Sequence, residues 1–178
     1  MSALWFPDTT VLCNFAAVGR LNLLRDLLDG RGRWTEAIAY EVSRSARVIP
    51  ALGTIPRDGW LGDPIAISLD ESMRVEAIRV AALDGARAHP LQHRGEAETC
   101  YVIQHVTGIP ESVWITDDEA AYDFGGQLGI FTWDTRTLVE HLIADGTLNP
   151  VEAFALLMEM LEADRSPRRP PGSPRELV

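Results

Sequence analysis

The chain has 178 residues, of which 46% are hydrophobic, and this size suits one domain with a full core. No apolar run approaches the ~20 residues that a membrane-spanning helix needs, and the N-terminus lacks a secretory pattern. We therefore expect a cytoplasmic protein without a membrane partner. The net charge of −10 argues against nonspecific nucleic-acid binding. It leaves a nuclease open, because the carboxylates of a metal site add to the acidic count.

Hydrophobic periodicity, interrupted by glycine, proline and capping residues, predicts strands that alternate with helices. The expected strands cover residues 4–8, a short piece around Trp34, 65–69, 113–116 and 130–133. The expected helices begin after Thr9 or Thr10, at Leu21, after Thr35, at Ser72, at Gly95, at Asp118, after Asp134 and near Pro150. This alternation predicts an α/β fold with a mainly parallel sheet flanked by helices.

One domain is expected over residues 1–164, in which residues 46–94 form an insertion or lid region. Proline and glycine interrupt the first part of this region, and residues 85–94 are polar and loop-like. After Arg165 the chain is rich in proline and arginine and has little apolar area to bury. Residues 165–178 are therefore expected to form a disordered or extended tail. The two isolated cysteines, Cys13 and Cys100, indicate reduced thiols.

Acidic residues occupy the places where an α/β sheet builds its sites. Asp8 follows the first strand, and Asp117 and Asp118 follow the strand at 113–116. Because the carboxyl ends of parallel strands meet at one edge, these side chains should converge there, and Glu41 and Glu96 on intervening helices can join them. Adjacent carboxylates repel each other unless a cation or protons compensate. The pattern therefore favours a Mg²⁺ or Mn²⁺ site suited to hydrolysis of a phosphodiester.

Four segments resemble the motifs of PIN-domain proteins, in particular VapC-type toxins and related uncharacterised PIN proteins. They are Pro7–Leu12 with its Asp-Thr-Thr, Ala37–Val42 with Glu41, Arg94–Thr99 with its Gly-Glu-Ala-Glu, and Thr116–Asp118 with its Thr-x-Asp. Their order and spacing are more specific than any single motif, and the similarity covers roughly residues 4–162.

The resemblance implies a PIN-like three-layer sandwich and a Mg²⁺- or Mn²⁺-dependent endoribonuclease. It also implies a toxin with RNA as substrate, an antitoxin protein as partner and a homodimer. The implied metal ligands are Asp8, Glu96 and Asp118, with Asp117 as a rival of Asp118. Glu41 would orient water or bind a second ion. The implied supporting residues are Thr10 and Thr116, which would donate hydrogen bonds, and Arg87 and Arg94, which would contact RNA phosphates.

The acidic residues also have structural interpretations. Asp8 can simply cap the following helix, and Asp117 and Asp118 can meet the dipole of the next one. Glu41 can lie on a solvated helix face. Glu98 can replace Glu96 if the register shifts.

The remaining polar and aromatic candidates are weaker. His89 and His93 lack a nearby cysteine pair or a helical setting and are expected to be surface histidines. Trp60, in a glycine-rich loop, is the better candidate for a partner contact.

Two alternative functions remain. The first is a catalytically weak PIN-fold module that binds protein or nucleic acid, which the acidic composition favours. The second is a phosphoryl-accepting receiver domain, which also gathers carboxylates at strand ends. The chain contains no lysine, whereas receivers use one, so this alternative ranks last.

Overall fold

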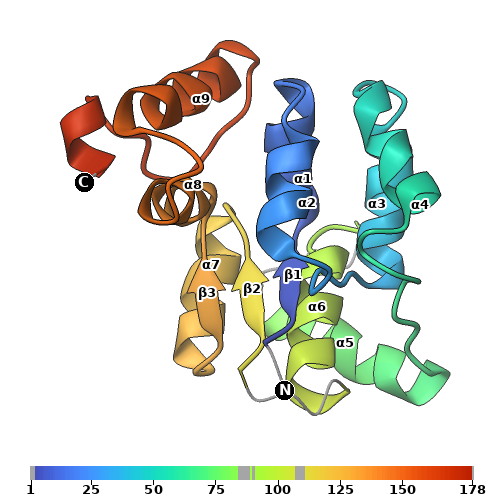
Figure 1. Cartoon of the computed structure of the whole chain (residues 1–178). Coiled ribbons are helices and arrows are strands. Elements are labelled where there is room, and N and C mark those ends of the chain that lie inside the picture. The colour runs from blue at the N-terminus through green and yellow to red at the C-terminus, as the bar shows by residue number, and fades with distance from the viewer. Residues whose placement is uncertain (1–2, 84–88, 90, 107–110, 178) are drawn as a thin grey trace.

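The computed structural model of the protein describes residues 3–83, 89, 91–106 and 111–177. It is an α/β arrangement in which helices surround a three-stranded parallel sheet (Figure 1). The strands are β1 (Trp5–Pro7), β2 (Val113–Ile115) and β3 (Phe131–Trp133). The α-helices are α1 (Thr9–Ala17), α2 (Leu21–Leu28), α3 (Glu36–Ser45), α4 (Thr54–Asp58), α5 (Leu69–Ala81), α6 (Arg94–His105), α7 (Glu119–Gln127), α8 (Thr135–Ala144) and α9 (Pro150–Glu162). Two 3₁₀ turns are η1 (Pro50–Gly53) and η2 (Pro174–Leu177).

The three strands end at the same edge of the sheet. β2 lies between β1 and β3 and is parallel to both, with Trp114 paired to Phe6 and Thr132. A helix follows each strand directly, and its N-cap residue is an aspartate that accepts a backbone N–H bond. These residues are Asp8 before α1, Asp118 before α7 and Asp134 before α8. Parallel pairing thus collects three carboxylates along one edge, as expected for sites in parallel α/β sheets.

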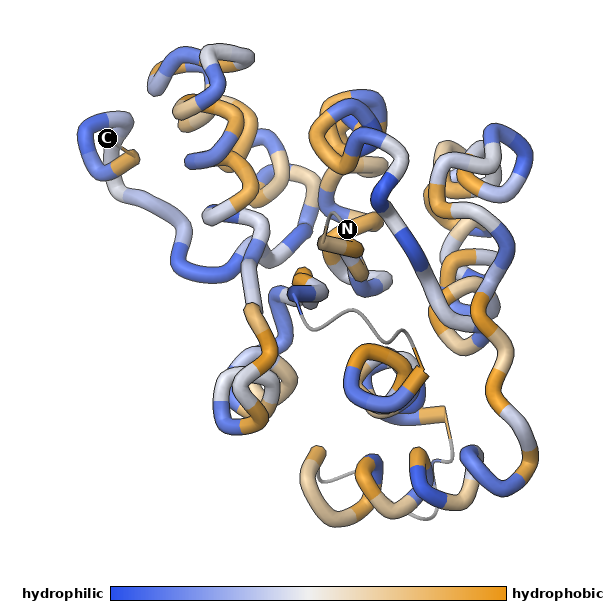
Figure 2. Tube along the Cα trace, turned by 60° about the horizontal axis from the view of Figure 1, so that its bottom comes forward, coloured by the Kyte–Doolittle hydropathy of each residue, from blue (hydrophilic) through white to orange (hydrophobic). Residues whose placement is uncertain are grey.

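Alternate residues of the strands are buried on opposite faces of the sheet. Phe6 and Trp114 pack with residues of α6 and α7 on one face. Trp5, Val113 and Ile115 pack on the other face with residues of α1, α8 and α9. Hydrophobic and hydrophilic stretches alternate along the helices, as expected for elements that bury one side (Figure 2). None of the helices within the described residues combines the length and the hydrophobicity that crossing a membrane requires.

The strand expected at residues 65–69 is not formed, and this expectation is corrected. Only Ile65 pairs there, in an isolated bridge with Thr35. Ser68 instead caps α5 in a reciprocal capping box with Glu71, so this helix begins at Leu69 and not at Ser72. Apolar alternation over 65–69 indicated a strand, but no neighbouring strand was present to complete the ladder.

The region 46–94 contributes to the body of the protein in its described parts. Leu52 in η1 and Ile55 in α4 are fully buried in the larger core cluster. The other part, α5, packs against α6 (Figure 1). Arg79 of α5 is fully buried, pairs with Glu76, and donates to the carbonyl oxygens of His89 and Gln92. It therefore ties α5 to the chain just before α6. Trp60, the expected partner contact, packs partly buried against the larger core cluster.

The expectation of a disordered or extended C-terminal tail is wrong. The tail folds back beside α8 and α9 and ends in η2, where Leu177 is buried (Figure 1). The backbone N–H of Arg168 donates to Asp117 Oδ1 at 3.0 Å. The guanidinium of Arg168 lies 4.0 Å from the ring centroid of Tyr122. The tail is thus held to the body both by polar contacts at the acidic edge of the sheet and by burial of Leu177.

Replacing Arg169 with alanine is expected to destabilise the protein by about 1–3 kcal/mol, the usual contribution of a hydrogen bond to a charged group. Its guanidinium donates twice to Asp134 Oδ2, at 2.9 and 2.6 Å, and the Asp134 side chain has no exposed area. Urea unfolding measures the change. Arg175→Ala, an exposed arginine in the same tail, is the control. Equal stabilities of the two variants would contradict a structural role for the tail.

Candidate metal centre

Asp8 is a buried carboxyl group at the end of β1. It is 3% exposed, and its Oδ1 accepts the backbone N–H of Val11 at 2.8 Å as the N-cap of α1. The hydroxyl of Thr116 donates to its Oδ2. Burial raises the pKa of Asp8 well above its usual value, against these two hydrogen bonds, and Asp117 and Glu96 raise it further. Asp8 therefore serves as the expected cap, and no ion pair with Asp8 is found among the described residues.

Thr116 connects the ends of β1 and β2. Its side chain is fully buried, and besides donating to Asp8 it accepts the backbone N–H of Asp118 at 3.1 Å. The sequence assigned a supporting role to Thr116, and the structure places it between two of the expected ligands.

Asp117 and Asp118 point to different surroundings. Asp117 Oδ1 accepts the backbone N–H groups of Thr135 and Arg168, and its Oδ2 accepts from Asn14 Nδ2 at 2.7 Å and from the Thr135 hydroxyl. Four donors thus occupy both oxygens of Asp117, which holds the strand edge to α1, α8 and the tail. Asp118 caps α7 through the backbone N–H of Ala121. Asp117 was expected as a rival metal ligand, but only Asp118 lies in the cluster.

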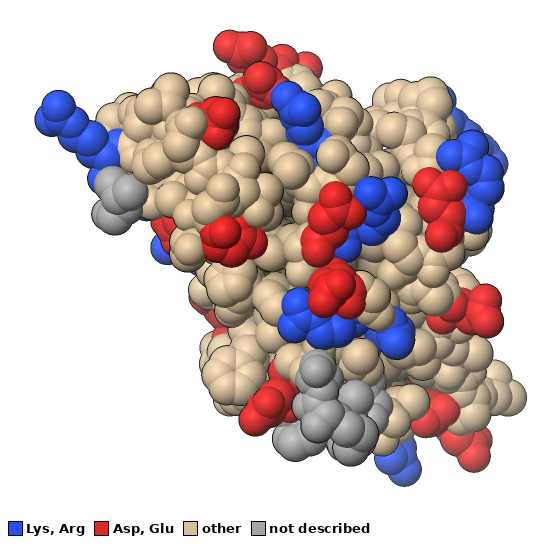
Figure 3. All heavy atoms as spheres, in the orientation of Figure 1, with Lys and Arg blue, Asp and Glu red and all other residues tan. Residues whose placement is uncertain are grey.

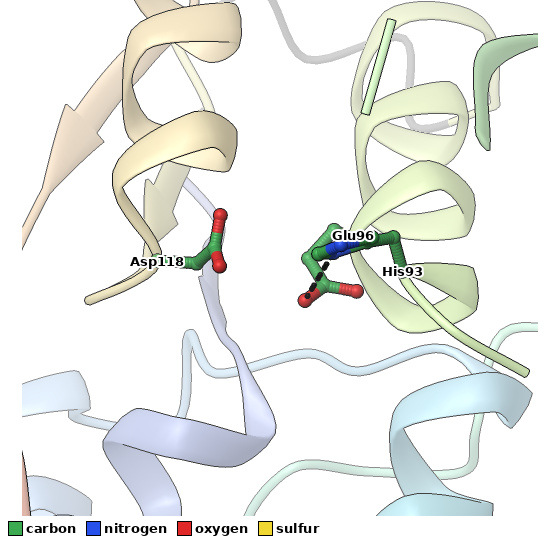
Figure 4. Close-up of side chains that lie close together, drawn as sticks. All are labelled: His93, Glu96 and Asp118. Atoms are coloured by element: carbon green, nitrogen blue, oxygen red, sulfur yellow. Dashed lines mark ion pairs between the residues drawn. The ribbon is translucent and has the colours of Figure 1, made fainter. Parts of the chain in front are cut away.

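Glu96 and His93 face Asp118 from the start of α6 (Figure 4). One ligand atom from each of the three residues lies within 4.8 Å of the others. His93 Nδ1 lies 3.6 Å from Glu96 Oε1. This Nδ1 is buried and makes no hydrogen bond within the described parts of the chain. His93 is therefore partly exposed, with its side chain 22% exposed but its Nδ1 buried beside Glu96, whereas His89 is exposed as expected.

The spacing of His93 and Glu96 in the sequence is a signal for their proximity. His93 is the N-cap residue of α6, in the left-handed conformation with φ 56°, and Glu96 follows three residues later. Residues three apart at a helix start lie on the same side. The polar composition of residues 85–94 predicts a loop, in which a spacing of three residues does not place side chains on one side.

Glu41 of α3 completes the acidic group. The Thr9 hydroxyl donates to Glu41 Oε2 at 2.6 Å. Burial raises the pKa of Glu41 to about 7, and Glu96 adds to the rise. Thr10, the expected supporting residue, is exposed, so its neighbour Thr9 makes the contact with a site carboxylate. Asp8 turns the chain into α1 so that the first helical residue, and not the second, faces α3.

Gly95 permits the close approach of α6 to α3. A β-carbon at this position would lie 2.6 Å from Ile38 Cδ1 and 2.9 Å from Glu41 Oε1. Any larger residue would push α3 away or displace the Glu41 carboxylate. The glycine before Glu96 thus has a packing role in the site.

Glu96 lies at the centre of the electrostatic cluster. Burial is the main cause of its raised pKa, and the nearby charge of Asp118 contributes. Its own charge raises the pKa values of both Asp8 and Glu41. The four acids named from the sequence, Asp8, Glu41, Glu96 and Asp118, therefore converge at the sheet edge. Mutual repulsion of this kind favours protons or a cation at the site.

The other expected residues fall outside the cluster. Glu98 is 2% exposed and accepts from the backbone N–H of Ala37 at 2.9 Å and from Arg94 Nε at 3.4 Å, so it joins α6 to α3. Arg94 also donates to Ser72 Oγ at 3.2 Å and stands at the rim of the site. Arg87, the other expected RNA contact, lies outside the described residues.

The side chains of this site fit a divalent ion, and the histidine among them favours a transition metal over magnesium. Glu96 and Asp118 offer the oxygen atoms that Mg²⁺ and Mn²⁺ accept, and the buried His93 Nδ1 adds a nitrogen within 4.8 Å of them. Asp8 stands outside this group of three and is coupled to it by charge repulsion with Glu96. Imidazole suits transition metals better than magnesium. No protein-family model, curated protein or solved structure matches this chain. The geometry of the side chains therefore carries the functional conclusion.

Replacing His93 with alanine is expected to weaken Mn²⁺ binding about tenfold while leaving Mg²⁺ binding nearly unchanged, because magnesium retains its oxygen ligands and waters. Titrations of the melting temperature with each ion measure both affinities. His89→Ala, an exposed histidine before the same helix, should change neither affinity. Equal losses for both ions would show that His93 acts only on the packing of α6.

Proposed function

We propose that this chain is a metal-dependent endoribonuclease with a PIN-like three-layer fold, which hydrolyses RNA phosphodiester bonds. The single observation that carries the proposal is the convergence of Asp8, Glu41, Glu96 and Asp118 at the carboxyl edge of the sheet. The proposal is also supported by the resemblance of the four sequence motifs, in their order along the chain, to those of PIN-domain proteins.

The protein's own groups divide the work of hydrolysis. A bound Mg²⁺ or Mn²⁺ supplies Lewis-acid chemistry, lowering the pKa of water and neutralising charge on the phosphate. Asp8, Glu96 and Asp118 hold the ion, and Thr116 fixes two of these ligands by its hydrogen bonds. Glu41, with a pKa of about 7, is suited to accept the proton of the attacking water, and Thr9 orients its carboxylate. Its affinity for protons near neutral pH supports a general-base role.

We expect RNA affinity to come from few contacts, because the chain has a net charge of −10. The face of the protein visible in Figure 3 carries arginine and acidic side chains side by side and no continuous basic area. Arg94 at the rim of the site is the expected phosphate contact, with the bound ion as a second positive charge. Few phosphate contacts imply a shallow dependence of RNA binding on salt.

The biological setting is proposed from the resemblance alone. It favours the toxin of a toxin–antitoxin pair, acting in the cytoplasm as a homodimer and held inactive by an antitoxin protein. A growth assay tests this part separately from the chemistry. The protein is expressed alone or together with small proteins encoded next to it, and an antitoxin would restore growth.

The chemistry is tested by cleavage of a fluorophore–quencher RNA by purified protein, in Mn²⁺, in Mg²⁺ and in EDTA. We expect cleavage only with a divalent ion, and a loss of at least a hundredfold in Glu96→Gln. Glu162→Gln, an exposed glutamate at the end of α9, is the matched control and should remain active. Equal cleavage by Glu96→Gln and the control would overturn the proposal.

If the wild-type protein cleaved none of the RNAs tested, melting experiments with Mn²⁺ would separate two explanations. If Mn²⁺ still raised its melting temperature, the alternative function would be favoured, a PIN-like module that binds protein or nucleic acid without cleaving it. If Mn²⁺ had no effect on melting, the carboxylates would not form a metal site.

A further inference from the structure

A groove opens beside the candidate metal centre, between α3, the start of α5 and the start of α6. Its volume is about 540 Å³. Its lining includes Tyr40, Glu41, Arg44, Leu69, Leu91 and Arg94. This is the size range of small-molecule and nucleotide sites in proteins.

The walls of the groove combine exposed apolar side chains with arginine. Tyr40 is 53% exposed, Leu69 85% and Leu91 51%. The guanidinium carbon of Arg44 lies 5.9 Å from the centroid of the Tyr40 ring. A half-exposed aromatic ring next to an arginine is an arrangement with which proteins bind single-stranded nucleic acids.

The groove is continuous with the site of the proposed reaction. Glu41 lines it and also belongs to the acidic cluster, and Tyr40 is its neighbour on α3. At the other wall Arg94 begins the helix that carries Glu96. The negative charge of the lining residue Glu98 is already engaged by Arg94 and by the backbone of Ala37. A nucleotide in the groove would thus place its phosphate between Arg94 and the metal ligands.

We propose that this groove binds one unstacked base of a single-stranded RNA, next to the phosphate that is cleaved. The base stacks on Tyr40, while Arg44 and Arg94 contact the flanking phosphates. Only a single strand offers a base with free faces, because the bases of a duplex stack on one another. The inference rests on the proposed function and adds the side chains that hold the base beside the cleaved phosphate.

The test is fluorescence anisotropy with a fluorescein-labelled RNA of about ten nucleotides, single-stranded or annealed to its complement. Ca²⁺ replaces Mn²⁺ to limit cleavage. We expect Tyr40→Ala to raise the dissociation constant for the single strand about tenfold, since one base–aromatic stack commonly contributes that much. Tyr40→Trp should restore binding. Phe131→Ala removes an aromatic side chain that is 60% exposed on β3 and should leave binding unchanged.

Three results would overturn the inference. They are tight binding of the duplex, unchanged affinity in Tyr40→Ala, and no binding of single-stranded RNA by the wild-type protein. Light scattering after gel filtration tests whether a second copy of the chain occupies the groove instead. A wild-type dimer that Tyr40→Glu dissociates would assign the groove to this contact.

Failure of the groove is distinguishable from failure of the proposed function. The Mn²⁺-induced melting shift reports on the carboxylates and should be the same in Tyr40→Ala and the wild-type protein. If cleavage and this shift persist while Tyr40→Ala binds RNA normally, only the groove assignment is wrong. If the shift and cleavage are absent from the wild-type protein, the proposed function itself is wrong.

Discussion

Replacing Asp8 with asparagine is expected to abolish Mn²⁺-dependent RNA cleavage while raising the melting temperature of the metal-free protein. The loss of activity should reach at least a hundredfold, because a neutral amide is a poor ligand where a carboxylate holds the ion. The gain in stability has a separate cause. Asp8 is almost fully buried, and burial raises its pKa well above the usual value, so the charged form destabilises the fold.

Asparagine can keep the local structure of Asp8. It is an equally good N-cap, so its Oδ1 can still accept the backbone N–H of Val11. Its amide group faces the Thr116 hydroxyl, which can accept as well as donate a hydrogen bond. The melting temperature at about pH 8 should therefore rise by a few degrees, at about 2–4 °C per kcal/mol for a chain of this size.

Differential scanning fluorimetry with and without Mn²⁺ checks the prediction for Asp8. The variant should melt higher than the wild-type protein in EDTA and should gain little from Mn²⁺. Asp123→Asn, on an exposed position of α7, is the control and should change neither measurement. A variant that melts lower in EDTA would mean that the Asp8 carboxylate serves structure first.

The metal-free protein is expected to lose stability as the pH rises from about 5 to about 8, and Mn²⁺ is expected to cancel this loss. Burial raises the pKa of Glu41 from 4.5 to about 7. Between these two values the folded state binds more protons than the unfolded state. The stabilising contribution of the Glu41 carboxyl group is therefore fully present below pH 4.5 and is lost as the pH rises through about 7. Asp8 and Glu96, also raised by burial, act in the same direction.

The size of the effect follows from the pKa of Glu41. The rise in the pKa of Glu41 corresponds to at most about 3 kcal/mol, or roughly 6–12 °C in melting temperature. Melting curves across this pH range, in EDTA and in millimolar Mn²⁺, measure the difference. Glu41→Gln should flatten the dependence in EDTA, whereas Glu36→Gln, exposed on the same helix, should not. A metal-free protein that becomes more stable toward pH 8 would refute the assignment of these carboxylates as unpaired buried groups.

Below about pH 4.5 the direction should reverse. The Ser68 backbone lowers the pKa of Glu71, and the Arg168 side chain lowers that of Glu119. Groups with a lowered pKa contribute stability that is lost on acidification. The metal-free protein should thus be most stable near pH 5.

The paired strands and the acid cluster were accessible from the sequence because their signals are local. Apolar runs end in Asp8 and in Asp117–Asp118, and a helix must start at once, so the strand ends could be placed. Parallel pairing then brings these ends to one edge, and Glu41 and Glu96 face that edge from their helices. The fold class and the group of four acids followed from these elements.

The identity of individual ligands depended on contacts between distant residues. Asp117 and Asp118 have the same local sequence environment, yet Asn14, Thr135 and the Arg168 backbone engage Asp117 and leave Asp118 to face α6. The sequence predicts a loop at His93, whereas in the structure its left-handed conformation at the N-cap of α6 places it beside Glu96. Hydrogen-bond partners more than a hundred positions apart, such as Asn14 and Asp117, have no sequence signal in a single chain.

By itself, the sequence determined the alternation of strands and helices and the positions of the carboxylates, because hydrophobic period and capping chemistry act over a few residues. Only the tertiary structure decided that the arginine tail docks on the sheet edge, that residues 65–69 do not form a strand, and which side chains share the site. These outcomes depend on which charges and backbone groups meet across the fold. Such meetings are set by packing, which local propensity does not encode.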